Sequence, residues 1–385
     1  MIECRTIKEL CSVVVDCPHS TPTWTVEGKI VVRSNNIKNG RIDFSSPSYT
    51  DDEHFQQRIK RATPQGGDII ITREAPMGEV GMIPEGIVCC LGQRMVLLRA
   101  NPEICDNYYL LYSLQSRYVQ HQISWSEGTG TTVSNLRIPH LEQLKIPYLP
   151  LSKQRQVSSV LRCLEGKIEQ NRVINDNLQQ QAKSLYEEMF LNDPDADMVS
   201  GTLSDIATIT MGQSPSGSSY NEESVGEVFY QGRAEFGFRF PTRRLFTTEP
   251  KRMAEPGDVL LSVRAPVGDL NVAYEKCCIG RGLGAIHSKT GDSSFMLYTM
   301  FALKPQLDVF NGEGTVFGSI NRDGLSNLPV NIPSPEEIAK FEAVVRPMDN
   351  LIRTNYEEIC RLQSIRDSLL PKLMSGEIDV SAVQL

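Results

Sequence analysis

Two long stretches of the chain place apolar side chains at alternating intervals of four and three residues. The first stretch runs from Val157 to Met189 and the second from Ile338 to Leu373. This alternation keeps one narrow apolar stripe along an α-helix, as in the seam of a coiled coil. The seam positions predicted are Leu161, Leu164, Ile168, Asn171, Leu178 and Leu185 in the first stretch, and Val345, Met348, Ile352, Asn355, Ile359, Leu362 and Leu369 in the second.

Each stretch is long enough for a helix of about 39 residues, or roughly 58 Å at 1.5 Å per residue. Ser334, Pro335 and Glu337 open the second helix with a capping residue, a first-turn proline and a reciprocal acid. A stripe this narrow needs a partner, so we expect the two helices to pair as an antiparallel coiled coil. Asn171 and Asn355 occupy equivalent seam positions, where they either set the register or are tolerated in a partly wet seam.

The segment that precedes each helix is also repeated. Residues 67–78 (GDIIITREAPMG) return as residues 257–268 (GDVLLSVRAPVG), at an offset of 190 residues. Other matches, including the vicinal pairs Cys89-Cys90 and Cys277-Cys278, keep the same order along the chain. A repeat of this size is a duplicated domain rather than a short solenoid unit. The aliphatic runs inside it predict buried strands in both copies.

The predicted fold class is α+β, with two duplicated mixed α/β domains separated by two long helices in an antiparallel coiled coil of pseudo-two-fold symmetry. We expect the first domain over residues 1–150, the first helix over 151–191 and a linker over 192–202. The second domain is expected over 203–333, and the second helix with a C-terminal tail over 334–385. Two copies of one domain suggest a ligand with two similar halves, and duplex DNA is the first candidate.

Composition narrows the classes of function. No stretch approaches 18 uninterrupted apolar residues, and the N-terminus lacks the apolar segment of a signal peptide. With no export signal, the ten cysteines suggest reduced thiols, so we expect a cytoplasmic protein that does not enter membranes. The net charge of −8 argues against a general nucleic-acid binder, so DNA contact would have to depend on local clusters.

The most basic cluster lies between Arg233 and Arg252. Six basic side chains face only two acidic ones there, and four phenylalanines are interspersed among them. The run Arg58-Ile59-Lys60-Arg61 is its weaker counterpart in the first copy. A basic run near aromatic side chains fits contact with phosphates. The alternative is a solvated pair of strands with phenylalanine inward and arginine outward.

The sequence contains no recognisable signature of catalysis. Residues 212–219 resemble a phosphate loop, but Ser218 stands where the lysine for the β- and γ-phosphates belongs. Residues 280–284 lack the spacing of a dinucleotide fingerprint. The histidines are scattered and the spaced cysteine pairs of zinc sites are missing, so we expect no metal site. The vicinal cysteines are interpreted as buried strand thiols.

These motifs, in this order, resemble the specificity subunit of a type I restriction–modification system. The stretches that carry the resemblance are residues 66–81 and 90–98 in the first copy, residues 211–216, 229–232, 256–269 and 277–283 in the second, and residues 154–155, 168–171 and 369–378 in the helices. The resemblance covers essentially the whole chain. It implies a non-catalytic subunit whose two target recognition domains each read one half of a split DNA target, while the coiled coil sets the spacing.

The resemblance also implies partners. Methylation subunits, usually two, would dock on this chain and supply adenine-N6 chemistry with S-adenosylmethionine. Restriction subunits, also two, would add an ATP-driven motor that uses Mg, so that no cofactor is bound by this chain itself. The two copies share few residues in their variable stretches, so the target should be asymmetric. Such a complex belongs in a bacterial or archaeal cytoplasm.

Candidate base-reading residues are arginines for guanine, Asn or Gln for adenine, and Ser or Thr for either. They are Arg33, Asn35, Asn36, Arg73, Gln93, Arg94, Thr129 and Thr131 in the first copy, and Gln213, Ser214, Gln231, Arg233, Arg243, Arg244, Arg264 and Arg281 in the second. Each could instead be a solvated surface residue, and an arginine beside Ala-Pro could form a structural ion pair. The rival reading of the chain is a coiled-coil scaffold that binds proteins rather than DNA.

Overall fold

The computed structural model of the chain describes residues 3–38, 40–125, 135–192, 198–264, 266–311 and 318–378. The chain forms two compact units, one of residues 1–170 with 358–385 and one of residues 171–357. Each unit contains one mixed α/β domain together with a part of each long helix. No helix in the described ranges is both long and apolar enough to cross a membrane.

The first unit is built on two sheets and two strand pairs. The central sheet is antiparallel with the order β2-β10-β7-β8, and the second has the order β6-β3-β9, in which β3 and β9 are parallel. The strands are β1 (Cys4–Thr6), β2 (Cys11–Asp16), β3 (Lys29–Val32), β4 (Ile37–Lys38), β5 (Arg41–Ile42), β6 (Ser48–Thr50), β7 (Ile69–Thr72), β8 (Val80–Met82), β9 (Cys89–Leu91), β10 (Met95–Ala100) and β11 (Lys145–Pro147). The pairs β1–β11 and β4–β5 complete the unit.

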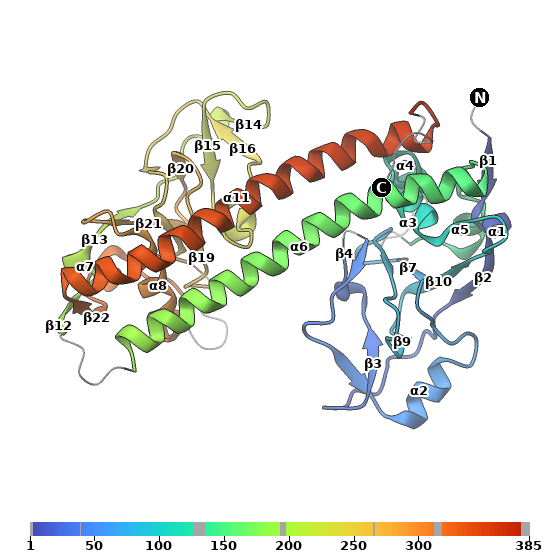
Figure 1. Cartoon of the computed structure of the whole chain (residues 1–385), viewed down its shortest axis with the longest axis horizontal. Coiled ribbons are helices and arrows are strands. Elements are labelled where there is room, and N and C mark those ends of the chain that lie inside the picture. The colour runs from blue at the N-terminus through green and yellow to red at the C-terminus, as the bar shows by residue number, and fades with distance from the viewer. Residues whose placement is uncertain are drawn as a thin grey trace. The chain divides into compact units, whose positions relative to one another are not determined.

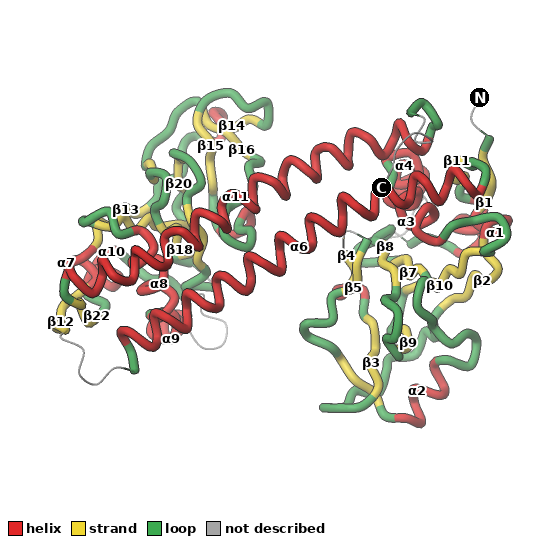
Figure 2. The backbone as a smooth tube through the Cα atoms, in the orientation of Figure 1, coloured by secondary structure: helices red, strands yellow, loops and turns green. Residues whose placement is uncertain are grey.

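Short helices surround these sheets, as Figures 1 and 2 show. They are α1 (Ile7–Leu10), α2 (Asp52–Arg58), α3 (Asn107–Gln115), α4 (Arg117–Ser124) and α5 (Ile138–Gln143). Side chains cap several of them. Thr6 and Glu9 form a reciprocal capping box at α1, in which the Thr6 N–H donates to Glu9 Oε2 at 2.6 Å.

The second unit repeats this plan. Its central sheet has the order β13-β21-β18-β19, and its second sheet has the order β14-β16-β15-β20-β17, with β15 and β20 parallel. The strands are β12 (Met198–Thr202), β13 (Ala207–Met211), β14 (Tyr220–Asn221), β15 (Glu227–Tyr230), β16 (Leu245–Thr247), β17 (Met253–Ala254), β18 (Val259–Ser262), β19 (Leu270–Val272), β20 (Cys277–Ile279), β21 (Leu283–Ser288) and β22 (Pro329–Pro333). The helices are α7 (Leu203–Ile206), α8 (Ser293–Ala302), α9 (Lys304–Asp308) and α10 (Arg322–Ser326).

The predicted duplication is confirmed by this topology. β2, β10, β7 and β8 occupy the same order in their sheet as β13, β21, β18 and β19, although few side chains are shared. The parallel pair recurs as well, since β3–β9 in one unit corresponds to β15–β20 in the other. The predicted fold class, with mixed α/β domains and long helices, is therefore correct.

The aliphatic runs of the repeat are continuous because the central sheets are covered on both faces. In β7, Ile69 and Ile71 enter the core formed with α3 and α4, whereas Ile70 enters the core on the side of β3 and β9. Successive side chains of a strand point to opposite faces, so a strand covered on both sides needs apolar residues throughout. In β18, Leu260 likewise packs in a different core from Val259 and Leu261.

The shared Gly-Asp and Ala-Pro-x-Gly motif builds turns at the two ends of β7 and β18. Gly67 and Gly257 have φ of +83° and +91°, which disfavours any side chain there. The carboxylate of the following Asp68 is buried and accepts the Gln65 N–H at 2.9 Å. Asp258 accepts the Glu255 N–H in the same way. The motif is thus a scaffold element, repeated because both copies need the same turns.

The two long helices are α6 (Leu151–Phe190) and α11 (Pro335–Met374). Within each unit their segments pack against each other in opposite directions (Figure 1). In the second unit, Asn175 of α6 pairs with Asn355 of α11, while Tyr186 further along α6 packs on Phe341 earlier in α11. In the first unit, Leu161 lies in one cluster with Leu373.

The predicted seam positions are buried or half-buried. Those that are fully buried are Leu161, Ile168, Asn171, Val345, Ile352 and Asn355, and those that are half-buried are Leu164, Leu178, Leu185, Met348, Ile359, Leu362 and Leu369. Asn355 donates its side-chain N–H to the side-chain oxygen of Asn175 at 2.8 Å. A polar pair inside an apolar seam favours one register, because any slip would leave buried amides facing apolar side chains.

Candidate nucleic-acid interface

Four loops of the second unit, two after strands of its central sheet and two after strands of its second sheet, lie against one another. They follow β13, β15, β18 and β20 and span residues 212–216, 231–232, 263–264 and 280–282. Backbone hydrogen bonds join them. The Gln213 N–H donates to the Ile279 carbonyl at 3.0 Å, the Gly280 N–H to the Tyr230 carbonyl at 2.8 Å, and the Val263 N–H to the Gly282 carbonyl at 3.0 Å. The loops therefore form one surface, although they come from distant parts of the sequence.

Glycine is required where these loops cross. A Cβ on Gly212 would lie 2.1 Å from the carbonyl oxygen of Gly280, and a Cβ on Gly280 would lie 2.9 Å from the backbone of Gln231. Real side chains do not tolerate such contacts with backbone, so only glycine allows the approach. This explains Gly212, Gly280 and Gly282 without any phosphate or dinucleotide loop.

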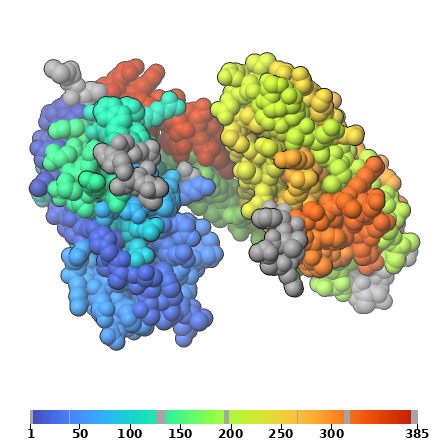
Figure 3. All heavy atoms as spheres, turned by 180° about the vertical axis from the view of Figure 1, so that it is seen from behind, coloured from blue at the N-terminus to red at the C-terminus, as the bar shows by residue number. Residues whose placement is uncertain are grey.

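Polar and basic side chains point outward from this loop surface. Gln213, Gln231, Arg264 and Arg281 are exposed, and the described residues offer neither arginine an ion-pair partner. Ser214 is half-buried and accepts the Arg281 N–H at 3.3 Å, so it supports the loop. Arginine and glutamine are the side chains that bind guanine and adenine edges in the major groove. The stretch from β13 to β17 that carries two of these loops contributes a broad part of the unit's surface (Figure 3).

The first unit has the same loops with different contacts. Gly92 donates its N–H to the Val32 carbonyl at 2.8 Å, and Arg73 donates its N–H to the Arg94 carbonyl at 2.8 Å. Arg94 is exposed, but its Nε lies 3.3 Å from the Glu74 carboxylate. Arg264 of the second unit occupies the chain position that corresponds to Glu74. The acidic residue that balances one loop surface is thus replaced by a basic residue in the other.

The prediction that Arg73 contacts DNA is corrected by the structure, which holds this side chain in an internal ion pair. The Arg73 side chain is 12% exposed, and its guanidinium pairs with Asp16 at 2.9 Å. It also donates to the Leu136 carbonyl at 2.9 Å and to Asn135. The side chain is held inside by these contacts, because an inward carboxylate on β2 attracts it. In the second unit, Met211 and the buried Val263 stand at the corresponding positions, so an ion pair is replaced by an apolar contact.

A double-mutant cycle on Arg73 and Asp16 tests this structural role. Arg73→Ala and Asp16→Ala should each lower the free energy of unfolding of the first unit by about 3 kcal/mol, because each removes one partner of a largely buried ion pair. The double variant should cost little more than either single one, which gives a coupling energy of roughly 1.5–3 kcal/mol in urea unfolding. The exposed pair Arg233–Asp269 is the matched control and should couple by less than about 1 kcal/mol. Strict additivity at Arg73 and Asp16 would contradict the assignment.

The remaining candidates of the first unit have mixed surroundings. Arg33 is exposed, and its guanidinium carbon lies 5.3 Å from the centroid of Trp24, which is itself 46% exposed. Asn35 is exposed, whereas Asn36 accepts the Arg33 N–H at 2.9 Å and caps that turn. Gln93 donates to the His19 carbonyl at 2.6 Å. An exposed indole beside an arginine is a surface suited to stacking, and no sequence pattern had singled out Trp24.

The basic run of the second unit is largely neutralised. Arg233, Arg243 and Arg244 are at least half exposed, but each pairs with a carboxylate, of Asp269, Glu275 and Glu235 respectively. Arg239 is only 4% exposed on its side chain and contacts the helix α11. Phe240 is buried as well. The run is therefore less positive than its composition suggests, and its phosphate-contact interpretation is wrong for Arg239.

Arg58, from the basic run of the first unit, is also buried. Its buried guanidinium donates to the carbonyls of Leu91 and Gly92, both at 2.8 Å, and to those of Pro18 and Ser20 at 3.3 and 3.1 Å. These carbonyls lie at the end of β9 and in the loops that follow β2 and β9. Arg58 therefore holds these backbone segments together by hydrogen bonds instead of contacting phosphates. Thr129 and Thr131, the other candidates, lie outside the described residues.

The vicinal cysteines are buried in parallel strands of the second sheets, as the sequence predicted. Cys89 and Cys90 lie in β9, and Cys277 and Cys278 in β20. Burial raises the pKa of Cys89 and Cys277 to about 12 and that of Cys90 to about 11, so these thiols stay protonated. The described residues contain no group of three or more His, Cys, Asp or Glu side chains placed to hold a metal ion.

A duplicated mixed α/β domain, with a polar loop surface on each copy and a long helix after each, defines a two-domain recognition protein. The family model described as the type I restriction modification DNA specificity domain matches residues 4–180 and 196–361. The chain belongs to this family and carries two copies of its domain.

Individual relatives agree with this assignment. A protein of Methanocaldococcus jannaschii described as the putative type I restriction enzyme MjaX specificity subunit is 30% identical, over 98% of this chain and 94% of the relative. The MjaIX specificity subunit of the same organism is 23% identical, over 82% of this chain and 78% of its own length. The crystal structure of the type I restriction–modification S subunit from M. genitalium shares the fold, with a TM-score of 0.59 at 18% identity, over 97% of this chain and 96% of that one.

Proposed function

We propose that this chain is the non-catalytic subunit that recognises DNA sequence for a type I restriction–modification complex. Each target recognition domain would read one half of a split target with its four-loop surface. The observation that carries this proposal is the recurrence of one loop framework with different outward side chains. The same backbone presents Arg33, Gln93 and Arg94 in one unit and Gln231, Arg264 and Arg281 in the other. Different side chains on one framework favour two different half-sites and hence an asymmetric target.

The reaction itself would be carried out by partners. Methylation subunits, in two copies, would bind S-adenosylmethionine and methylate adenine N6, and two restriction subunits would use ATP and Mg to move and cut DNA. An adenine must leave the base stack before it can be methylated, so this chain would grip the duplex beside the flipped base. Such a complex acts on chromosomal DNA and would therefore work in the cytoplasm.

Co-expression with a methylation subunit tests the proposal directly. The chain and that subunit are produced together in a host without other adenine methylation, and the modified genome is sequenced by a method that detects N6-methyladenine. A split, asymmetric motif with half-sites about one helical turn apart, near 10 bp, is the expected result. Methylation at no defined motif would refute sequence recognition and favour the alternative, a coiled-coil scaffold for protein partners.

Lengthening both helices by one heptad should change the spacer and not the half-sites. The insertions are placed after Gln170 in α6 and after Glu357 in α11, where the chain passes between the two units. Seven residues keep the seam in phase and add roughly 10 Å at 1.5 Å per residue, or about three base-pair steps. The genome modified by this variant would be compared with that of a variant in which seven residues are inserted into the surface turn after Ser224, which should keep the original spacer. An unchanged spacer in the helix variant would disprove that the two long helices set the spacing of the half-sites.

A further inference from the structure

In each target recognition domain, one arginine contacts the long helix that follows the domain, and the two contacts fall at equivalent positions of the two helices. In the first unit, Arg41 bonds to the carboxylates of Glu165 and Glu169 on α6 and donates to the Glu165 carbonyl at 3.2 Å. In the second unit, Arg239 pairs with Asp349 on α11 at 2.8 Å. Glu165 and Asp349 are 184 residues apart, as are Leu144 and Leu328 of the repeat, so the two carboxylates are equivalent.

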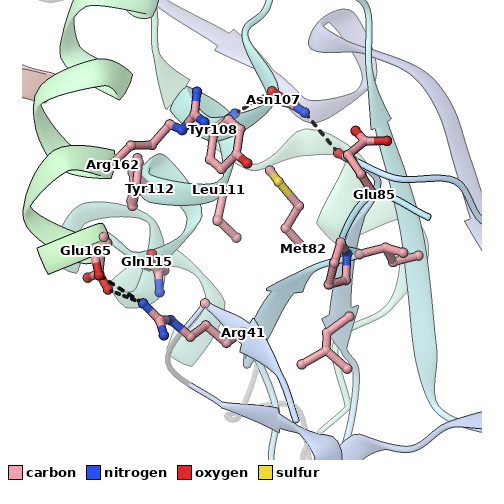
Figure 4. Close-up of a pocket in the computed structure, with 16 residues that line it drawn as sticks. Arg41, Met82, Glu85, Asn107, Tyr108, Leu111, Tyr112, Gln115, Arg162 and Glu165 are labelled. Atoms are coloured by element: carbon pink, nitrogen blue, oxygen red, sulfur yellow. Dashed lines mark hydrogen bonds and ion pairs between the residues drawn. The ribbon is translucent and has the colours of Figure 1, made fainter. Parts of the chain in front are cut away.

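A tyrosine from the domain lies beside each contact. Tyr298 of α8 donates its hydroxyl to Asp349 at 3.1 Å and accepts a hydrogen bond from Arg239 at 3.1 Å. Its equivalent in α3 is Tyr112, which lines the same cavity as Arg41 and Glu165 (Figure 4). Burial raises the pKa of Tyr298, so its hydroxyl keeps the proton that it donates. Each unit thus brings an arginine, an acidic helix residue and a tyrosine together.

The two arginines reach this position from different local structures. Arg41 belongs to the short strand β5, whereas Arg239 lies in the irregular segment between β15 and β16. Both segments lie outside the stretches that repeat between the two copies. An arginine–carboxylate contact that persists through such divergence indicates a requirement that both copies share. A requirement for stability alone could be met by apolar contacts, as Val263 and Met211 show elsewhere in the second unit.

The surroundings of the two contacts differ. A cavity of about 380 Å³ lies beside Arg41, between the domain and α6, and Arg162 stacks on Tyr108 at its wall, 4.1 Å from the ring centroid (Figure 4). The equivalent cavity beside Arg239 is about 100 Å³. Phe240 lines it and packs on Tyr356 of α11, with 5.0 Å between the ring centroids, and the Arg239 side chain is only 4% exposed against 36% for Arg41. The Arg239 contact is therefore packed tightly, and the Arg41 contact borders on open space.

We propose that the Arg41–Glu165 and Arg239–Asp349 contacts fix the orientation of each target recognition domain on its helix, and so decide where its loops meet the DNA. This inference rests on the proposed function. The arginines and carboxylates are positioning residues, since they lie at the helix and not on the loop surface. Across a domain of about 20 Å, a rotation of roughly 10° moves the loops by about one base-pair step of ~3.4 Å. Loss of one contact should therefore allow spacers of more than one length, while the bases that are recognised stay the same.

The test uses the full chain, co-expressed with its methylation subunit, and sequencing of the modified genome. Asp349→Asn and Arg41→Gln are made singly. Both variants should keep the two half-sites of the native chain but also methylate targets whose spacer is one base pair longer or shorter. Modification of such targets should rise by roughly tenfold, which corresponds to a loss of ~1.4 kcal/mol of discrimination. Lys340→Ala, which removes two exposed ion pairs from α11, is the control and should leave the spacer unchanged.

Charge reversal provides a second, independent readout. The double variant Arg239→Asp with Asp349→Arg restores an ion pair of opposite sense and should return modification towards the single native spacer, unlike Asp349→Asn alone. If Asp349→Asn does not accumulate as folded protein, Arg41→Gln in the more open first unit carries the same test. A single, unblurred spacer in folded Arg41→Gln and Asp349→Asn would overturn the inference and leave the proposed function intact. A native chain that yields no split motif would overturn both.

Discussion

Replacing Arg264 and Arg281 together with alanine should weaken binding to duplex DNA that carries the native target by roughly 30- to 1,000-fold. Both guanidinium groups are exposed on the four-loop surface of the second unit, and both are without a carboxylate partner among the described residues. An arginine without an ion-pair partner can use all of its N–H donors to bind DNA, whereas a paired arginine must first break its ion pair. The affinity of the chain with its methylation subunit would be measured by fluorescence anisotropy at several salt concentrations.

The salt dependence tells the two kinds of contact apart. If either arginine contacts phosphate, its loss should lower the slope of log affinity against log salt by about 0.9. If it reads a base edge, the slope should change little and specificity should relax at one position of the second half-site. Lys276→Ala is the matched control, because it removes an exposed but ion-paired cation outside the loops. Native affinity in the double variant would remove these loops from the interface.

Phe341→Ala should be among the most destabilising single changes in the second unit. Phe341 is fully buried and packs on Tyr186 and Phe190 of α6 and on Tyr298 of α8, with ring centroids 5.5–5.9 Å apart. It therefore joins both long helices to the recognition domain. Truncation of a buried phenylalanine leaves a cavity and costs about 3–5 kcal/mol, so the unfolding temperature of this unit should fall by roughly 10 °C.

Phe238→Ala offers a control of identical chemistry. Phe238 is 47% exposed, so the same atoms are removed with little loss of packing. Calorimetry should show a lowered transition for Phe341→Ala and a nearly native one for Phe238→Ala. Equal effects of the two changes would show that the aromatic cluster does not hold the helices to the domain.

The sequence by itself determined the elements that depend on local periodicity. The four-three alternation over residues 157–189 and 338–373 falls within α6 (Leu151–Phe190) and α11 (Pro335–Met374), because a coiled-coil seam repeats its requirement about once in every turn of helix. The repeat of Gly-Asp and Ala-Pro-x-Gly marked the duplicated domain, since both copies need glycine at positive φ and a buried aspartate in the same turns. These requirements are met by neighbours in sequence and can therefore be read from it.

Only the tertiary structure decided which polar side chains are available to a ligand. Arg73, Arg239 and Arg281 look alike in the sequence, yet Arg73 is held by Asp16, Arg239 by Asp349, and Arg281 is exposed. The partners lie 57 and 110 residues away from the first two arginines, at separations that no local pattern encodes. An arginine is free or fixed according to the carboxylates and carbonyls that folding places beside it. For this reason the orientation contacts on the helices, and the convergence of the four loops, could be recognised only in three dimensions.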